Sequence, residues 1–132
     1  MIHRAEGMFE VELTPQPPEG EDAANPGRLL IKKKFSGDLE ATSRGQMLSV
    51  MAPVKGSAGY VALEEVTGTL HGKRGNFVLQ HFGIMNRGVP QDHNVVVLPD
   101  SGTAELTGLT GSMKISVEGD KHRYEFEYSL GD

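Results

Sequence analysis

The segment "TGTLHGKRGNFVLQHFG" (residues 67–83) combines closely spaced glycines with a run of alternating apolar residues. Glycine occupies positions 68, 72, 75 and 83, and Phe77, Leu79 and His81 stand at every second position between the last two. Alternation with period two is typical of a β-strand that buries one face, and glycine marks turns and sharp bends. The segment therefore predicts two strands joined near 72–75, with His81 on the apolar face of the second.

The same alternation continues on both sides of this segment. The segments "SMKISVE" (112–118) and "HRYEFEYSL" (122–130), with the turn "EGDK" between them, predict a hairpin. Further strands are expected at 8–13, 28–35, 38–50, 59–71, 75–86, 93–98 and 103–108. The proline-rich stretch 14–27 is expected to be a surface loop, with a lid over a site as the alternative. Eight or nine short strands without helices predict one all-β domain over residues 1–132, either a barrel or a sandwich.

Three glycine motifs align with one another along the chain. "FSGDLEA" (35–41) matches "VTGTLHG" (66–72) at an offset of 31, and "LHGKRGNFVL" (70–79) matches "LTGLTGSMKI" (106–115) at an offset of 36. Glycine reaches positive φ without steric cost in a loop, and inside strands, as at Gly37 and Gly68, it permits the sharp coiling of a small barrel. We therefore expect these glycines at the corners of a closed sheet.

The loop length at 72–75 decides which side chains accompany His81. If these four residues form the loop, positions whose numbers add to 147 lie opposite each other, and Glu64 lies diagonally from His81. A three-residue loop shifts the sum to 148 and brings Glu65 to that face instead. In the alignment with an offset of 31, Lys33 corresponds to Glu64. Lys33, Glu64 and His81 are thus expected to project into a mostly apolar interior.

Two interpretations of this polar cluster stay open. A buried charge has to be paired or to change its protonation state, so the three groups either satisfy one another structurally or position an acid or base beside a bound molecule. For Lys33, a solvated place in the run 32–34 is a further alternative. Catalytic residues are not assigned. The candidate ligand-binding residues of the interior are Lys33, Tyr60, Glu64, Phe77, Leu79, His81 and Met85.

No motif in the sequence indicates a metal or a cofactor. Histidine occurs at positions 3, 71, 81, 93 and 122 without the spacings typical of metal ligands, and there is no cysteine. No nucleophile-elbow motif points to Ser/His/Asp catalysis. We therefore expect neither a bound metal nor a cofactor.

Composition and charge exclude further classes of partner. The formal net charge is −5, aromatic residues make up 6% and tryptophan is absent, which disfavours nucleic-acid binding. No apolar run approaches the roughly 18 residues of a membrane span, and the first residues do not resemble a signal peptide. We expect a soluble, cytoplasmic protein with no nucleic-acid or membrane partner.

The motifs "FSGDLEA", "TGTLHGKRGNFVLQHFG" and "SGTAELTGLTGSM" together resemble a bacterial family, domain of unknown function 3224. The resemblance extends from about residue 5 to residue 128. It implies a fold similar to the allene oxide cyclase barrel, a closed antiparallel meander of eight strands. The plant cyclases act on an unsaturated fatty-acid epoxide inside the barrel, but none of their polar site residues is matched here one by one.

Three functions are consistent with this sequence. The leading hypothesis is a barrel that binds a small, largely apolar molecule in its interior, with Glu64 and His81 as polar anchors. The alternative is an enzyme of the isomerase or cyclase type in which the same two residues move a proton. The third is a filled barrel that acts through its outer surface as a homo-oligomer or partner module. Whether the protein is an enzyme is left open.

Overall fold

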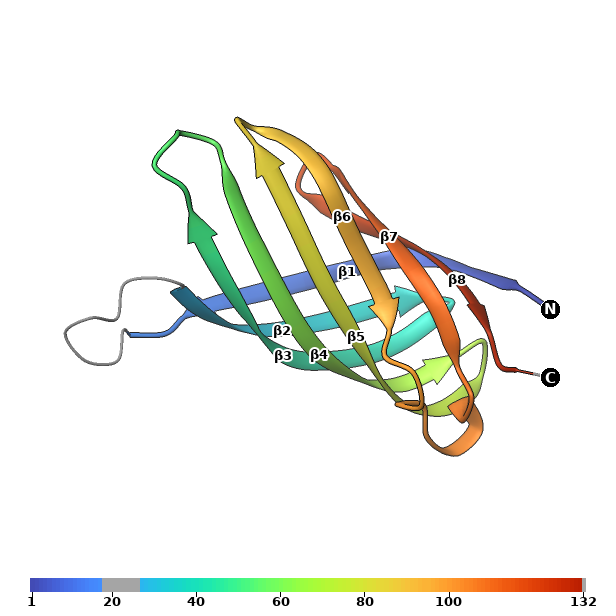
Figure 1. Cartoon of the computed structure of the whole chain (residues 1–132). Coiled ribbons are helices and arrows are strands. Elements are labelled where there is room, and N and C mark those ends of the chain that lie inside the picture. Colours follow the sequence, from blue (N-terminus) through green and yellow to red (C-terminus); the bar gives the residue numbers. More distant parts are fainter. Residues whose placement is uncertain (18–26, 132) are drawn as a thin grey trace.

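The chain forms a closed barrel of eight antiparallel strands, in agreement with the predicted fold (Figure 1). The computed structural model describes residues 1–17 and 27–131. Each strand pairs with its neighbours in sequence, and β8 pairs with β1 to close the barrel. The strands are β1 His3–Pro15, β2 Gly27–Gly37, β3 Leu39–Met51, β4 Ala58–Leu70, β5 Lys73–Asn86, β6 Val89–Val97, β7 Thr110–Glu118 and β8 Lys121–Ser129. No helix in the described residues has the length and apolarity that a membrane crossing requires.

The alternation seen in the sequence selects the inner face of each strand. In β5, Phe77, Leu79 and His81 are buried, while the residues between them are more exposed. Large side chains fill the half of the barrel interior that lies next to the β2–β3 and β4–β5 turns. This packing stabilises the fold by removing apolar surface from water. Its fully buried large side chains include Phe35, Leu39, Leu70, Phe77, Leu79, Tyr124 and Phe126.

The turn between β4 and β5 is shorter than either predicted loop. Leu70 pairs with Lys73, so opposite positions add to 143 rather than 147 or 148, and both expected registers are wrong. The turn consists of His71 and Gly72 alone, with φ values of 47° and 79°. Two successive residues at positive φ fit the tight turn whose twist matches that of the flanking strands. Gly75 consequently lies inside β5, opposite Gly68.

Two further expectations about the chain path are corrected. Residues 103–108, predicted as a strand, contain a short 3-10 helix, Ala104–Leu106, whose Leu106 packs with Leu109 across one end of the barrel. The ends of the predicted loop 14–27 belong to strands, because Thr14 pairs with Leu30 and Gly27 with Ser49. The loop and lid interpretations otherwise fall on residues 18–26, which lie outside the described part of the chain.

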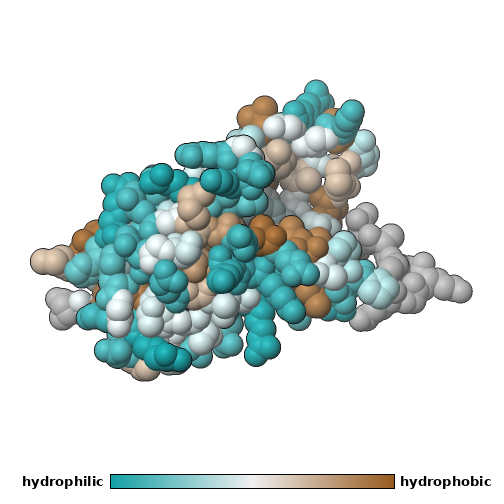
Figure 2. Space-filling model, turned by 180° about the vertical axis from the view of Figure 1, so that it is seen from behind, coloured by the Kyte–Doolittle hydropathy of each residue, from teal (hydrophilic) through white to brown (hydrophobic). Residues whose placement is uncertain are grey.

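At the end of the barrel away from the β2–β3 and β4–β5 turns, the wall is open between β1 and β8. The pairing of β1 with β8 ends at Phe9 and His122, after which β1 continues to Pro15 alongside β2 alone. On the other side, β6 and β7 pair at Val96 and Ser112. β3 stays paired with β2 as far as Ser49 and Gly27, whereas the upper ends of β4 to β6 lie away from β1 (Figure 1). Seen from behind, a notch with hydrophobic side chains along it separates an upper lobe from the rest of the molecule (Figure 2).

A pair of glycines brings β1 and β2 into close contact at the closed end. Gly7 lies directly opposite Gly37, and the Tyr124 hydroxyl occupies the space beside them, where it donates to the Ser36 carbonyl at 2.8 Å and accepts from the Leu39 amide at 2.9 Å. A Cβ at position 37 would lie 2.7 Å from the Glu6 carbonyl oxygen, and its φ is +102°. Glycine is therefore required there for both conformation and space.

We predict that Gly37→Ala destabilises the barrel much more than Gly72→Ala. Both glycines have positive φ, but a Cβ at Gly72 meets nothing within 4 Å. Gly72→Ala should therefore cost only the conformational strain, about 1 kcal/mol, whereas Gly37→Ala adds steric overlap and should cost roughly 3 kcal/mol. Urea unfolding of the two variants measures the difference. Equal losses of unfolding free energy would contradict the role given to this contact.

Candidate functional site

Glu64 is the centre of a buried polar cluster inside the barrel. Its side chain is fully shielded from solvent, and both carboxylate oxygens are occupied. Oε1 accepts a hydrogen bond from Lys33 Nζ at 2.9 Å and lies 2.5 Å from His81 Nε2, while Oε2 accepts from Ser43 Oγ at 2.5 Å. The structure thus brings together three of the predicted interior residues and adds Ser43.

Neighbouring strands place these four side chains at one level of the barrel. Lys33 on β2 lies opposite Ser43 on β3, and Glu64 on β4 lies opposite Gly45 on β3. His81 on β5 faces Ala62, so Glu64 is its diagonal neighbour, as expected despite the different register. A Cβ at Gly45 would approach the Glu64 Cβ to 2.8 Å, so glycine leaves the room that the Glu64 side chain requires.

The partners of Glu64 keep its carboxyl group ionised. Burial alone raises its pKa, but the hydrogen bond from His81, the charge of Lys33 and the hydrogen bond from Ser43 outweigh this and lower the pKa to about 2. Glu64 is therefore a carboxylate at neutral pH, and the buried charge is compensated by the Lys33 ammonium. A carboxylate this weakly basic is poorly suited to accept a proton in a reaction near pH 7.

The contact with Glu64 fixes where His81 carries a proton. A carboxylate can only accept, so His81 Nε2 must donate in this contact. The other ring nitrogen, Nδ1, has no hydrogen-bond partner among the residues that the structure describes. Because the described residues contain no buried side-chain nitrogen or oxygen without a partner, Nδ1 must reach solvent-accessible space. In the neutral ring this nitrogen is an acceptor.

Lys33 is held on its other side by aromatic rings. Its Nζ lies 4.8 Å from the centroid of Phe9 and 5.8 Å from that of Phe35, and its side chain is 7% exposed. An ammonium over the face of an aromatic ring is attracted by the ring quadrupole. The solvated position considered for Lys33 is therefore wrong, and its ammonium faces Glu64 and two rings.

Tyr60 and His93 lie between this cluster and the open end. Their ring centroids are 6.2 Å apart, and Tyr60 is half-buried. Burial, followed by the negative charge of Glu64, raises the pKa of Tyr60. Burial also lowers the pKa of His93, and positive charge at His81 or Lys33 lowers it further. Both groups are therefore uncharged at neutral pH.

The remaining predicted residues divide between the core and the surface. Phe77 and Leu79 are fully buried in the packed half of the barrel, where Phe77 stacks on Phe126 at 5.9 Å. Met85 lies beyond a register irregularity after Gly83 and is 39% exposed. The expectation that Met85 is enclosed in the interior is therefore wrong. Bending of β5 at this point turns its last residues away from the interior.

Sequence reasoning missed Ser43 and His93. Ser43 stands on the alternating inner positions of β3, between Ala41 and the glycine at 45, and this pattern could have identified it. His93 was expected as the first residue of a strand at 93–98, but β6 already begins at Val89, after a turn at Arg87 and Gly88, and His93 lies inside it opposite Gly83.

A second histidine is hydrogen-bonded at the closed end. His71 Nδ1 lies 2.5 Å from the Tyr128 hydroxyl, and its Nε2 lies 3.6 Å from Asp38. Tyr128 is buried against Phe126, at 5.3 Å between ring centroids. These contacts hold His71 in its turn conformation. The described residues contain no group of three histidine, aspartate or glutamate side chains arranged to hold a metal ion.

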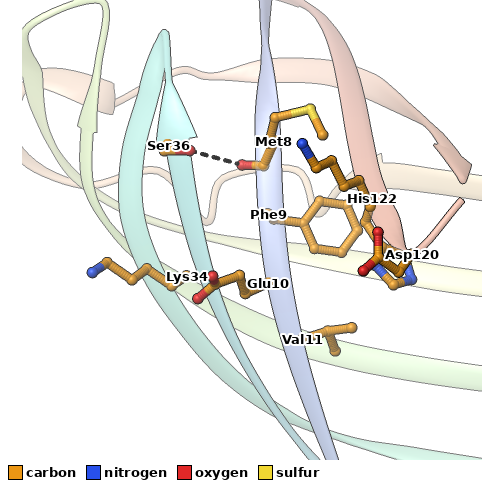
Figure 3. A pocket seen from close by; sticks show the side chains of 9 residues that line it. Met8, Phe9, Glu10, Val11, Lys34, Ser36, Asp120 and His122 are labelled. Carbon is orange, nitrogen blue, oxygen red and sulfur yellow. Dashed lines mark hydrogen bonds between the residues drawn. The ribbon is translucent and has the colours of Figure 1, made fainter. Parts of the chain in front are cut away.

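The larger of the two cavities described lies where β8 separates from β1 (Figure 3). It has a volume of about 740 Å³, within the range of small-molecule sites. Phe9 and Val11 belong to the inner face of β1, whereas Met8 and Glu10 belong to its outer face, so the lining includes both sides of the strand. The Phe9 ring that lines this cavity also contacts Lys33, so the cavity and the polar cluster share this ring.

The second cavity is a groove of about 440 Å³ over β2, β3 and β4, lined mainly by outward residues such as Lys32, Arg44 and Glu65, and its lining also includes Lys33 and Ser43 of the cluster. His81 and Glu64 line neither of the two cavities. The larger cavity is linked to the cluster through the contact of Phe9 with Lys33, whereas Lys33 and Ser43 themselves line the groove.

We predict that Glu64 stabilises the fold in a pH-dependent way. Removing the carboxylate charge by Glu64→Gln leaves a buried ammonium unpaired and should cost about 3–5 kcal/mol at neutral pH. The pKa of Glu64 is lowered on folding from 4.5 to about 2, so its contribution is complete above pH 4.5 and is lost as the pH falls through about 2.

The free energy of unfolding in urea, measured between about pH 7 and pH 3, checks this expectation. The gap between wild type and Glu64→Gln should narrow as the pH falls. Glu65→Gln is the matched control, because Glu65 is the adjacent residue on the exposed face. A gap that stays constant over this range, or an equal loss in the control, contradicts the assignment.

Comparison with known proteins identifies relatives over the whole chain. The crystal structure of a protein of unknown function from the DUF3224 family of Shewanella oneidensis MR-1 is 48% identical, with a TM-score of 0.91 and 100% of both chains covered. No curated protein matches the sequence. The family model described as "Protein of unknown function (DUF3224)" matches residues 5–128. The chain therefore belongs to the DUF3224 family.

Proposed function

We propose that this barrel binds a small molecule with an apolar body and a polar end. The polar end lies at His81, and the apolar body lies in the laterally open half beside Phe9 and Val11. The observation that carries this proposal is the buried cluster of Lys33, Glu64, His81 and Ser43, in which His81 Nδ1 is accessible and has no partner within residues 1–17 and 27–131.

The energetic cost of the cluster supports a role beyond folding. Replacing a buried ion pair by apolar residues of similar volume is often neutral or stabilising, so stability alone is a weak reason to bury Lys33 and Glu64. Perturbed ionisable groups beside a cavity are typical of functional sites.

The geometry favours binding over proton transfer by Glu64. Both carboxylate oxygens are occupied by Lys33, His81 and Ser43, and the pKa of about 2 makes the group a weak base. Glu64 is thus suited to orient His81 rather than to touch a reacting atom. In the isomerase or cyclase alternative, His81 Nδ1 would be the group that takes the proton.

Titration with the neutral fluorescent probe N-phenyl-1-naphthylamine tests the binding proposal. We expect saturable binding of one probe per chain, and about tenfold weaker binding to Val11→Trp, because Val11 is an inward residue opposite Lys33 and lines the larger cavity. Glu12→Trp is the matched control on the outer face of the same strand. The natural chain has no tryptophan, so each introduced indole also reports the distance to the probe by energy transfer.

Two results would contradict the proposal. One is the absence of saturable binding to the wild type. The other is equal affinity of Val11→Trp and Glu12→Trp for the probe, because a ligand in the interior must distinguish a bulky group on the inner face from the same group on the outer face.

An apolar outer surface supports a second candidate function, self-association. Leu48, Val61 and Phe82 form a direct row across β3, β4 and β5, with Leu63 and Ile84 next to it, and all five are substantially exposed. Outward positions of a barrel in water are usually polar. Contiguous exposed apolar patches mark interaction sites.

A second copy of this chain is the partner that the charges favour. The polar positions beside the row are the amides of Gln46, Gln80 and Asn94, together with Arg28 of β2, which lies opposite Leu48. Arg28 lies at one end of the row, so two copies related by a two-fold axis can meet face to face with their Arg28 side chains at opposite ends, although each chain carries a net charge of −5. Sedimentation velocity tests this candidate. A dimer should dissociate in Phe82→Lys and persist in Val117→Lys, whose site is exposed on β7 away from the row. A monomeric wild type, or equal behaviour of the two variants, excludes it.

A further inference from the structure

The polar cluster directs its hydrogen-bond donors at Glu64. The Ser43 hydroxyl and His81 Nε2 each direct a hydrogen at Glu64. The Lys33 ammonium donates to Glu64 and is covered by the rings of Phe9 and Phe35. What the cluster offers a ligand is therefore the lone pair of His81 Nδ1, which accepts when the imidazole is neutral.

The electrostatics around this nitrogen do not favour an anion. The Lys33 charge is cancelled by Glu64 at 2.9 Å, so the pair presents no net positive charge. His93, the other imidazole near the open end, is neutral at neutral pH because burial lowers its pKa. The negative charge of Glu64 also reaches Tyr60, whose pKa it raises in addition to the effect of burial.

We infer that the ligand of this barrel carries a neutral hydrogen-bond donor, such as an alcohol, enol or phenol hydroxyl, at the end that meets His81 Nδ1. This inference rests on the proposed binding function and specifies its ligand class. A hydroxyl group gives its hydrogen to Nδ1. An ether has no hydrogen to give, and a carboxylate would place a second negative charge next to the lone pair. The site selects hydroxylated apolar molecules over ethers and fatty-acid-like anions.

Four probes with the same apolar body test this selectivity: naphthalene, 2-naphthol, 2-methoxynaphthalene and 2-naphthoate. Their affinities are measured by fluorescence titration at neutral pH, where the naphthol is neutral and the naphthoate is ionised. We expect 2-naphthol to bind about tenfold more tightly than 2-methoxynaphthalene, the ratio that one hydrogen bond supplies, and 2-naphthoate to bind most weakly.

Two variants separate the role of Nδ1 from the stability of the fold. In His81→Gln the side-chain amide can still donate to Glu64 from the position of Nε2, but no acceptor remains at the position of Nδ1. The triple variant Lys33→Met, Glu64→Leu and His81→Phe replaces the cluster by apolar groups and should fold, since such replacements are often neutral. Both variants should bind naphthalene and should bind 2-naphthol and 2-methoxynaphthalene equally.

The outcomes distinguish this inference from the function on which it rests. If naphthalene and its three derivatives all fail to bind the wild type, the binding function itself is wrong. If they bind but 2-methoxynaphthalene or 2-naphthoate equals or exceeds 2-naphthol, only the ligand class is wrong. Retention of the naphthol preference in a folded His81→Gln protein likewise overturns the role of Nδ1.

Discussion

The arrangement of β2 to β5 depends on the compensation of one buried carboxylate. Glu64 is fully enclosed, and an unpaired charge in that position would cost several kcal/mol. Lys33, Ser43 and His81 compensate it from three different strands, so their contacts are satisfied together in one pairing of β2, β3, β4 and β5. Gly45 opposite Glu64 leaves space for the side chain. The contacts of Glu64 therefore favour one register of β2, β3, β4 and β5.

The faces of the strands were predictable because the side-chain period is two. The predicted sum of 147 and the observed sum of 143 are both odd, so the same residues of β4 and β5 face inward in either register. Glu64 for this reason remains the diagonal neighbour of His81. The position of Lys33 beside Glu64 agreed with the glycine repeat, since both residues occupy equivalent inner positions.

What the sequence could not predict depends on contacts between distant residues. His71 adopts its turn conformation with its backbone amide bonded to Asp38 and its ring to Tyr128, neither of which is local in sequence. The segment 103–108 alternates like a strand, yet Leu106 packs across the end of the barrel, a position that local pattern cannot reveal. The short pairing of β6 with β7, at Val96 and Ser112, likewise depends on how the whole sheet closes and not on local sequence. The open half, and with it the position of His93 beside Tyr60, followed only from the structure.

The pairing of β1 with β8 has a consequence for how this chain reaches its native state. His3 lies opposite Tyr128, so the last ladder joins residues that are almost the whole sequence apart. Such distant partners make closure slow in comparison with the hairpins, which join neighbouring strands. Until closure, β1 and β8 expose unpaired backbone groups that can add a strand from another molecule. During synthesis, β1 emerges long before β8, and a chaperone that shields this edge would act in that interval.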